Sequence, residues 1–311
     1  MENINNGIYY IDKLLNNKIL EEMKNYSEIS FGDKFNQTVD NLPSTIKKIT
    51  FGYNFDKPID NLPSGLEHLV LGEDYNFPLD NLPTSLKSLT LGKFYYKYML
   101  DNLPAGLQYI NLGWYYNQKV DNLPSGLKHI VFSNEFNQSV DNLPPNVETI
   151  IFGNHFNQTV DNLPDGVRSI TFGDGFNQPV NNLPIDLENL KFGYMFNQCV
   201  DYLPENLQSL EFGDEFDMHV NNLPQKLLNL TFSVYYNKKI DKFSPSLKNL
   251  TLGYYYNQPL DYLPPSLENL VVGKKFTQCL DHLPVSLTVI KGGVMKNNIF
   301  YKNSNSNSLP T

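Results

Sequence analysis

Apolar residues recur along this chain with a fixed period of 20 residues. In one repeat, residues 187–207 (LENLKFGYMFNQCVDYLPENL), the apolar positions are Leu187, Leu190, Phe192, Phe196, Val200 and Leu203. This spacing matches neither the 3.6-residue period of an amphipathic helix nor the long alternation of a hairpin. About thirteen such repeats fill residues 26–293, with a single inserted residue within 91–101. A short fixed period predicts one elongated repeat domain instead of two globular domains.

Each repeat predicts one short β-strand, then a turn and an extended return segment. We expect the strand at segments such as residues 207–212, LQSLEF, where the leucines and the phenylalanine point inward. A glycine follows most strands and marks the turn, and the later proline restrains the residue before it to an extended conformation. The apolar side chains of one repeat cannot offset the entropy of ordering 20 residues. Stacked repeats cover one another, so the predicted fold class is a mainly β repeat solenoid with one long parallel sheet.

Two polar positions also recur. An asparagine follows the phenylalanine of most repeats, and we expect its carboxamide to satisfy backbone groups that the bend leaves without strand partners. An aspartate precedes the Asn-Leu-Pro segment, as at Asp40 and Asp161. We expect it to cap the turn by accepting a backbone N–H group. Calcium binding is disfavoured because the glycine-rich nonapeptide of calcium-binding β-rolls is absent.

The two ends of the chain depart from the period. Residues 1–25 place Ile11, Leu14, Leu15, Ile19, Leu20 and Met23 on one face of a helix. Such a helix would cover the apolar end of the first repeat, so we predict a short N-terminal helical cap. Residues 294–311 form a polar tail, and we predict that its last dozen residues are disordered.

The repeated segment FNQxVDNLPxxLxxLxFG resembles the FNIP repeat, a relative of the leucine-rich repeat found in social amoebae and large viruses that infect amoebae. The resemblance covers residues 26 to about 292. It implies a leucine-rich-repeat-like solenoid that acts as a protein-interaction surface. Viral members often carry an N-terminal F-box that recruits ubiquitin ligase machinery. Only about 25 residues precede the first repeat here, so no F-box is expected in this chain.

Composition and charge narrow the possible functions. The net charge is -9 and the isoelectric point is about 5.0, which disfavours nucleic acid and anionic membranes as partners. No secretory leader or long apolar run is present, so we expect a cytoplasmic protein. Cys199 and Cys279 are four repeats apart, too distant for a disulfide. No cofactor motif or catalytic constellation is recognisable, so we predict neither a cofactor nor enzymatic activity.

One outward position of the strands alternates in charge from repeat to repeat. Its residues are Lys47, Glu67, Lys87, Gln108, Lys128, Glu148, Arg168, Glu188, Gln208, Leu228, Lys248 and Glu268. Alternation converts like-charge repulsion between neighbouring strands into ion pairs. We interpret this column as structural.

Aromatic residues that break the repeat pattern are the candidates for partner binding. Phe94, Tyr109, Trp114 and Tyr115 lie in adjacent repeats, beside the inserted residue. Tyr235, Tyr254 and Tyr255, with Tyr194 some repeats earlier, form a second group. Exposed aromatic side chains are typical of the residues that dominate binding energy in protein interfaces.

The sequence therefore predicts a non-enzymatic scaffold that binds a protein partner through its sheet and the adjoining turns. One alternative is substrate recognition for ubiquitin ligation, with the recruitment module supplied by a partner. Another is a structural or virion component without a specific ligand.

Overall fold

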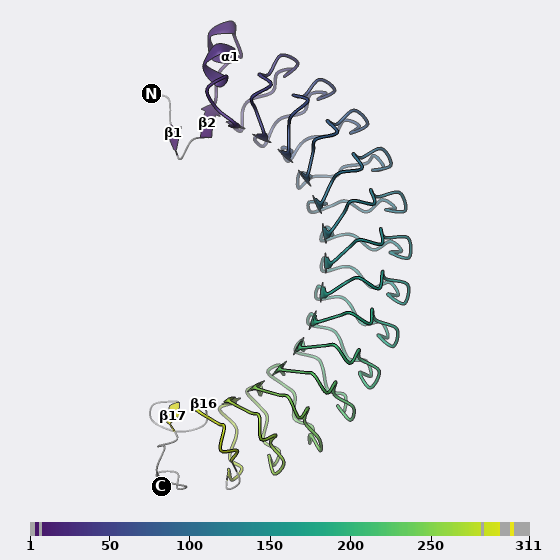
Figure 1. Cartoon of the computed structure of the whole chain (residues 1–311), viewed down its shortest axis with the longest axis vertical. Coiled ribbons are helices and arrows are strands. Elements are labelled where there is room, and N and C mark those ends of the chain that lie inside the picture. The colour runs from purple at the N-terminus through teal and green to yellow at the C-terminus, as the bar shows by residue number, and fades with distance from the viewer. Residues whose placement is uncertain (1–3, 6–7, 281–282, 293–298, 302–311) are drawn as a thin grey trace. The chain divides into compact units, whose positions relative to one another are not determined.

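The computed structural model describes residues 4–5, 8–280, 283–292 and 299–301. Among these residues it consists of short strands, connecting turns and one short helix (Figure 1). The chain divides into two compact units, residues 1–156 and 157–311.

In the first unit, β2 to β9 form a parallel sheet in which each strand pairs with the next along the chain. A short strand, β1, pairs antiparallel with β2. The elements are β1 (Ile4–Asn5), β2 (Ile8–Ile11), α1 (Asn17–Met23), β3 (Glu28–Phe31), β4 (Lys48–Thr50), β5 (His68–Val70), β6 (Ser88–Thr90), β7 (Tyr109–Asn111), β8 (His129–Val131) and β9 (Thr149–Ile151).

In the second unit, β10 to β16 pair in the same parallel manner. The last strand, β17, is antiparallel to β16. The elements are β10 (Ser169–Thr171), β11 (Asn189–Lys191), β12 (Ser209–Glu211), β13 (Asn229–Thr231), β14 (Asn249–Thr251), β15 (Asn269–Val272), β16 (Val289–Gly292) and β17 (Ile299–Tyr301).

Each coil of the solenoid is one 20-residue repeat, as predicted. Leu190 pairs with Leu210, and Leu210 with Leu230, so equivalent residues of successive repeats lie side by side. Within each unit the strands line one edge of the coils, and the turns and return segments form the other side (Figure 1). The proline of the return segment closes a turn into the next strand, since the Pro63 carbonyl accepts from the Leu66 N–H at 3.0 Å.

The core of each unit contains the apolar positions that the sequence predicts. In the repeat from residue 187 all six predicted side chains are buried, and Leu187 and Phe196 are 0% exposed. The rings of Phe192 and Phe196 stack with centroids 3.6 Å apart. Phe192 also stacks on Phe212 of the next repeat at 5.8 Å. Two columns of stacked rings thus run through the coils.

The predicted asparagine row is confirmed. The Oδ1 atom of Asn177 accepts the backbone N–H of Asn197 at 2.9 Å, and Asn197 accepts that of Asp217 at 3.0 Å. Gln198 adds a donor to Asn177 at 3.1 Å. Each carboxamide therefore binds the bend of one coil to the bend of the next.

The prediction for the aspartate row is wrong about the donor, which is an asparagine side chain and not a backbone N–H group. Asp40 Oδ1 accepts from the side-chain Nδ2 of Asn61 at 3.0 Å, and Asp60 accepts from Asn81 at 3.0 Å. Asp161 accepts from Asn182 in the same way. The carboxylate therefore links successive coils instead of capping its own turn with a backbone N–H.

The N-terminal helix is shorter than predicted. It spans Asn17–Met23, with Asn16 as the N-cap that accepts from the Ile19 N–H at 3.0 Å. Ile11 belongs to β2, which pairs with β3, and Leu14 is 73% exposed. The segment Ile8–Ile11 alternates in burial like the other strands, so strand pairing overrides the helical periodicity there.

The predicted polar tail contains one element, β17, at Ile299–Tyr301. It pairs with residues 289–291 of β16, so disorder does not extend over the whole of the last dozen residues. The rest of the predicted tail, residues 294–298 and 302–311, lies outside the described residues.

Candidate protein-interaction surface

Two residues of each coil are held outward by the turn that follows the strand. In the second repeat, the carbonyl of Gly52 accepts from the N–H of Phe55 at 3.3 Å, so Tyr53 and Asn54 occupy the two corners of the turn. We call these two corners the first and second turn positions. The N–H at the second position bonds to the carbonyl at the first position of the preceding coil, as Asn54 does to Asp33 at 3.0 Å. The two positions therefore form continuous outward rows within each unit.

More than half of the exposed large apolar residues in the described part of the chain lie in these turns. They are Tyr53, Phe94, Tyr95, Trp114 and Tyr115 in the first unit, and Tyr194, Met195, Val234, Tyr235, Tyr254 and Tyr255 in the second. Because most equivalent positions in other coils are polar, these side chains interrupt an otherwise polar row. Exposed apolar clusters of this kind mark interaction sites.

In the first unit, three of the four predicted aromatic residues, Phe94, Trp114 and Tyr115, are exposed in the turns. Trp114 and Tyr115 are 47% and 43% exposed. The ring of Phe94 lies edge-on to Tyr53 with centroids 5.7 Å apart. Tyr53 was not predicted as a binding residue, although its turn position is visible once the repeats are aligned. Tyr109 is half-buried and lies on β7, between Ser88 of β6 and His129 of β8.

In the second unit the structure brings the predicted tyrosines into contact. Tyr235 and Tyr255, at equivalent positions of successive coils, stack with centroids 5.5 Å apart. Tyr254 meets Tyr255 edge-on at 4.8 Å. All three are at least 39% exposed. These rings form one cluster while much of their surface remains open to solvent.

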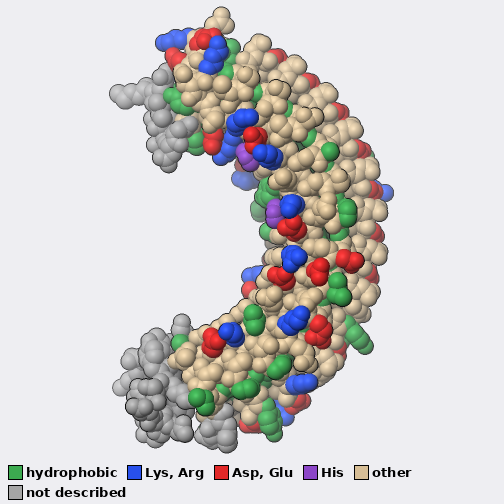
Figure 2. Space-filling view, in the orientation of Figure 1, with side chains coloured by type: hydrophobic (Ala, Val, Ile, Leu, Met, Phe, Trp, Pro, Cys, Tyr) green, Lys and Arg blue, Asp and Glu red, His purple; other side chains and the backbone are tan. Residues whose placement is uncertain are grey.

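The predicted ion pairs between strands are formed. Glu67 lies between Lys47 and Lys87 of the neighbouring coils, and the hydrogen bond from Lys87 lowers the pKa of Glu67. Arg168 pairs with Glu188 at 2.6 Å, and Lys248 with Glu268 at 2.9 Å. Acidic and basic side chains lie next to one another on the face shown in Figure 2. This column is self-neutralised and offers little net charge to a partner.

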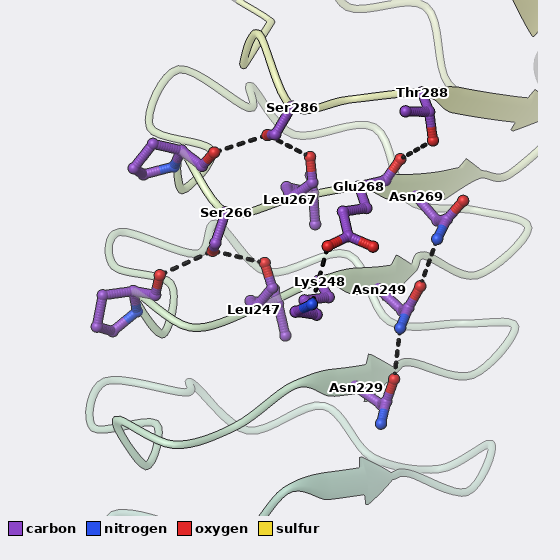
Figure 3. A network of polar contacts seen from close by, with 12 residues as sticks. Asn229, Leu247, Lys248, Asn249, Ser266, Leu267, Glu268, Asn269, Ser286 and Thr288 are labelled. Atoms are coloured by element: carbon purple, nitrogen blue, oxygen red, sulfur yellow. Dashed lines mark hydrogen bonds and ion pairs between the residues drawn. The ribbon is translucent and has the colours of Figure 1, made fainter.

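A second polar row on the strands of the second unit is also internally satisfied. Asn249 Nδ2 donates to Asn229 Oδ1, and Asn269 Nδ2 to Asn249 Oδ1, each at 2.6 Å (Figure 3). Ser266 donates to the carbonyls of Pro245 and Leu247 on the return side of the same coils. These bonds fix the strand register, so the turns are the less constrained surface.

A polar pocket of about 250 Å³ lies on the return side of the second unit. Its lining includes Asp201, Asn222 and Lys242. Asn221 and Lys242 replace the usual aspartate and asparagine of the row here, so the pocket marks an interruption of that row. Its lining is mainly polar, which makes it a less suitable protein-docking site than the aromatic turns.

No group of three or more metal-ligating side chains occurs among the described residues. Cys199 and Cys279 are exposed and form no disulfide. Within the same residues, no helix has the length and apolar character needed to cross a bilayer.

Comparison with solved structures shows a leucine-rich-repeat-like fold. CroV588, a giant-virus protein described as a novel circular leucine-rich-repeat structure, is 35% identical with a TM-score of 0.86. The match covers 97% of this chain and 50% of that chain. YopM from Yersinia enterocolitica WA-314 has 20% identity and a TM-score of 0.58, over 88% of this chain and 60% of its own, and supports the fold alone. This chain therefore spans half to three fifths of the length of these proteins.

Comparison with protein families identifies the repeat itself. No significant relative is found among curated protein sequences. The FNIP repeat model matches residues 55–94, 100–134, 119–155, 136–175, 156–195, 176–214 and 196–235. These matches cover more than half of the chain and coincide with the coils described above. The chain belongs to the FNIP repeat family.

Proposed function

We propose that this protein is a non-enzymatic scaffold that binds a protein partner through the aromatic residues of its turns and the adjoining strand face. Leucine-rich-repeat-like folds are typical of protein–protein interaction, and such repeat proteins are typically scaffolds. The strand face carries ion pairs and amide rows that are satisfied within the chain. The turns carry the exposed aromatic side chains.

The observation that carries the proposal is the exposure of Trp114, Tyr115, Tyr235, Tyr254 and Tyr255 at positions that are polar in most coils. Exposed aromatic rings are unfavourable in water, and they supply large contact areas at low entropic cost when a partner covers them. The fold does not need these exposed rings. In the same coils, the core rings are those of Tyr116, Tyr236 and Tyr256, which are buried.

The test is affinity capture from a host lysate with the wild-type chain and the variants Trp114→Ala and Tyr255→Ala. We expect at least one variant to lose the captured partner while its melting temperature stays nearly unchanged, because exposed substitutions alter stability little. Ile185→Ala is the matched control, because Ile185 is an exposed apolar residue on the return side, away from the turns that follow the strands. Capture that is unchanged in both aromatic variants would contradict the proposal.

The identity of the captured protein separates the alternatives. Ubiquitin ligase components among the proteins lost with the variants would assign the scaffold to substrate recognition. Abundant incorporation into viral particles, without a captured partner, would favour the structural alternative.

A further inference from the structure

The charged residues beside the aromatic turns differ between the two units. In the first unit, Glu73 pairs with Lys93 at 2.7 Å, immediately before Phe94. The hydrogen bond from Lys93 to Glu73 raises the pKa of Lys93. Glu135 pairs with His155 at 2.6 Å in the coils after Tyr115. Two of the charged residues that flank the aromatic side chains of the first unit, Glu73 and Glu135, therefore have partners within the chain.

In the second unit, three charged residues beside the aromatic turns have no ion-pair partner within the described residues. We call Tyr235, Tyr254 and Tyr255 the aromatic row, and Val234 lies beside Tyr235 in the same turn. Glu215 holds the second turn position of the coil before this row, and Lys274 and Lys275 hold both turn positions of the coil after it. All three charged residues are exposed. In the part of the chain that the structure describes, no ion pair involves them.

Hydrogen bonds show that these residues lie on successive coils. The N–H of Val234 donates to Asp214 Oδ1 at 3.4 Å, beside Glu215. The N–H of Tyr255 donates to the carbonyl of Val234 at 3.0 Å. The N–H of Lys275 donates to the carbonyl of Tyr254 at 3.1 Å. The order along the surface is therefore acidic, aromatic, aromatic and basic.

The spacing prevents the two charged ends from pairing with each other. Tyr235 and Tyr255 are separated by 5.5 Å between centroids, and strands of a sheet lie about 4.8 Å apart. Three such steps separate Glu215 from Lys275, which gives roughly 14 to 17 Å between their turns. A ligand that matches both ends must span this distance and cover the rings between them.

We propose that the aromatic row binds an extended, proline-rich segment of a partner protein, with a basic residue near Glu215 and an acidic residue near Lys274 and Lys275. This inference rests on the proposed function and specifies the chemistry of the partner. A polyproline II segment rises about 3.1 Å per residue, so the two charges stand about five residues apart. Such a segment is already stiff, and it packs its rings against aromatic side chains. Its backbone carbonyls are unpaired and accept hydrogen bonds from tyrosine hydroxyls.

The test measures fluorescence anisotropy with labelled, terminally blocked peptides and the full chain. The probe is Arg-Pro-Pro-Pro-Pro-Glu, and the controls carry Arg at both ends or Glu at both ends. We expect the mixed peptide to bind about threefold or more tightly than either control, because each control loses one exposed ion pair. Tyr255→Ala should weaken binding about tenfold, as expected for an aromatic anchor. Trp114→Ala, in the first unit, should leave binding unchanged.

The decisive experiment reverses the charge at the basic end of the aromatic row. The double substitution Lys274→Glu with Lys275→Glu should transfer the preference from the mixed peptide to the peptide with Arg at both ends. Both positions are exposed, so we expect the melting temperature to change little, which is checked for every variant. Equal binding of the three peptides, or an unaltered preference in the reversed variant, would overturn the inference.

The remaining outcomes distinguish this inference from the general function. If the peptides show no preference while Tyr255→Ala still loses the captured partner, the interaction surface stands and the proposed chemistry is wrong. If the peptide preference holds while neither aromatic variant affects capture, the peptide site stands and the scaffold proposal fails. If sedimentation shows a dimer that Tyr255→Ala dissociates, a second copy of the chain occupies the row and the inference is overturned.

Discussion

Tyrosine replaces phenylalanine at the innermost ring position of several coils. The hydroxyl groups of Tyr75, Tyr96, Tyr236 and Tyr256 are buried without a hydrogen-bond partner among the described residues. Burial raises the pKa of Tyr75, so its phenol stays neutral at physiological pH. A buried hydroxyl that lost its water and gained no partner costs stability.

We expect Tyr75→Phe to increase the free energy of unfolding by about 1 kcal/mol, because it removes this unpaired group and keeps the stacked ring. Urea denaturation measures the change. Tyr116→Phe is the comparison, since the Tyr116 hydroxyl donates to the Lys119 carbonyl at 3.5 Å. Its gain should be smaller or absent. A loss of stability in Tyr75→Phe would show that the hydroxyl has a partner such as a buried water.

Single residues differ in how well the sequence predicts their contacts. The asparagine row was predicted correctly because a carboxamide next to a bend can accept a backbone N–H group of the next coil, as Asn177 does. The donor to the aspartate row was not predicted, because Asn61 and Asp40 are 21 residues apart and their contact depends on how two coils align. The edge contact between Tyr53 and Phe94 spans two coils and was missed for the same reason.

At the scale of elements, the neighbouring coil explains the glycine that follows most strands. A Cβ atom on Gly213 would lie 1.7 Å from the carbonyl oxygen of Gly193. Among the described glycines, a positive φ is recorded at Gly113, with φ 71°. The close approach of two backbones, more than turn conformation, therefore explains the glycine row.

Gly213→Ala should cost about 1 to 3 kcal/mol or more, because the coils must separate to admit the methyl group. Gly106→Ala is the matched control, since the nearest atom to its Cβ would be the Thr84 carbonyl oxygen at 3.7 Å. That substitution should be neutral or slightly stabilising. Chemical denaturation of both variants measures the difference, and equal effects would disprove the steric explanation.

The ion-pair column predicts a dependence of stability on pH. The hydrogen bond from Lys87 lowers the pKa of Glu67 below its ordinary value of 4.5. A carboxylate with a lowered folded-state pKa stabilises the fold above the ordinary pKa, and this contribution is lost as pH falls through the folded-state pKa. Glu67→Gln should therefore lower the melting temperature at pH 7 and have no effect at strongly acidic pH.

Thermal melts across pH 2 to 7, at low and high salt, check this expectation. High salt should reduce the difference between the two proteins at pH 7, because exposed charges are screened. A difference that stays constant across the pH range would assign the effect of Glu67→Gln to packing instead of charge.

The strand elements were predictable because their inward residues repeat every 20 positions. β2 was not, because the segment Ile8–Ile11 lacks the glycine and proline that mark the other coils. Its place is set by pairing with β3, with Tyr9 beside Ile29. The helical face predicted for residues 11–23 included side chains that the structure divides between a strand, a loop and a helix.

At the scale of the whole molecule, each unit is held together by contacts between coils more than within them. The parallel strands pair with strands of neighbouring coils, and the asparagine, aspartate and ring columns all run from coil to coil. The period alone was enough to predict this architecture, because a repeat this short has no other way to cover its apolar side chains. The choice of partner depends on the residues that do not repeat, which is why the period could not predict it.

This architecture predicts that one coil cannot fold alone. A peptide of residues 187–207 loses the cover that Phe172 and Phe212 give to the ring of Phe192, and it keeps no strand partner. We expect its circular dichroism spectrum to be that of a disordered chain at micromolar concentration. A fragment of residues 157–292 retains successive coils and should melt cooperatively. Nearest-neighbour coupling distinguishes a solenoid from a chain of independent domains. A folded monomeric peptide, or a fragment that melts without cooperativity, would therefore contradict the dependence of each coil on its neighbours.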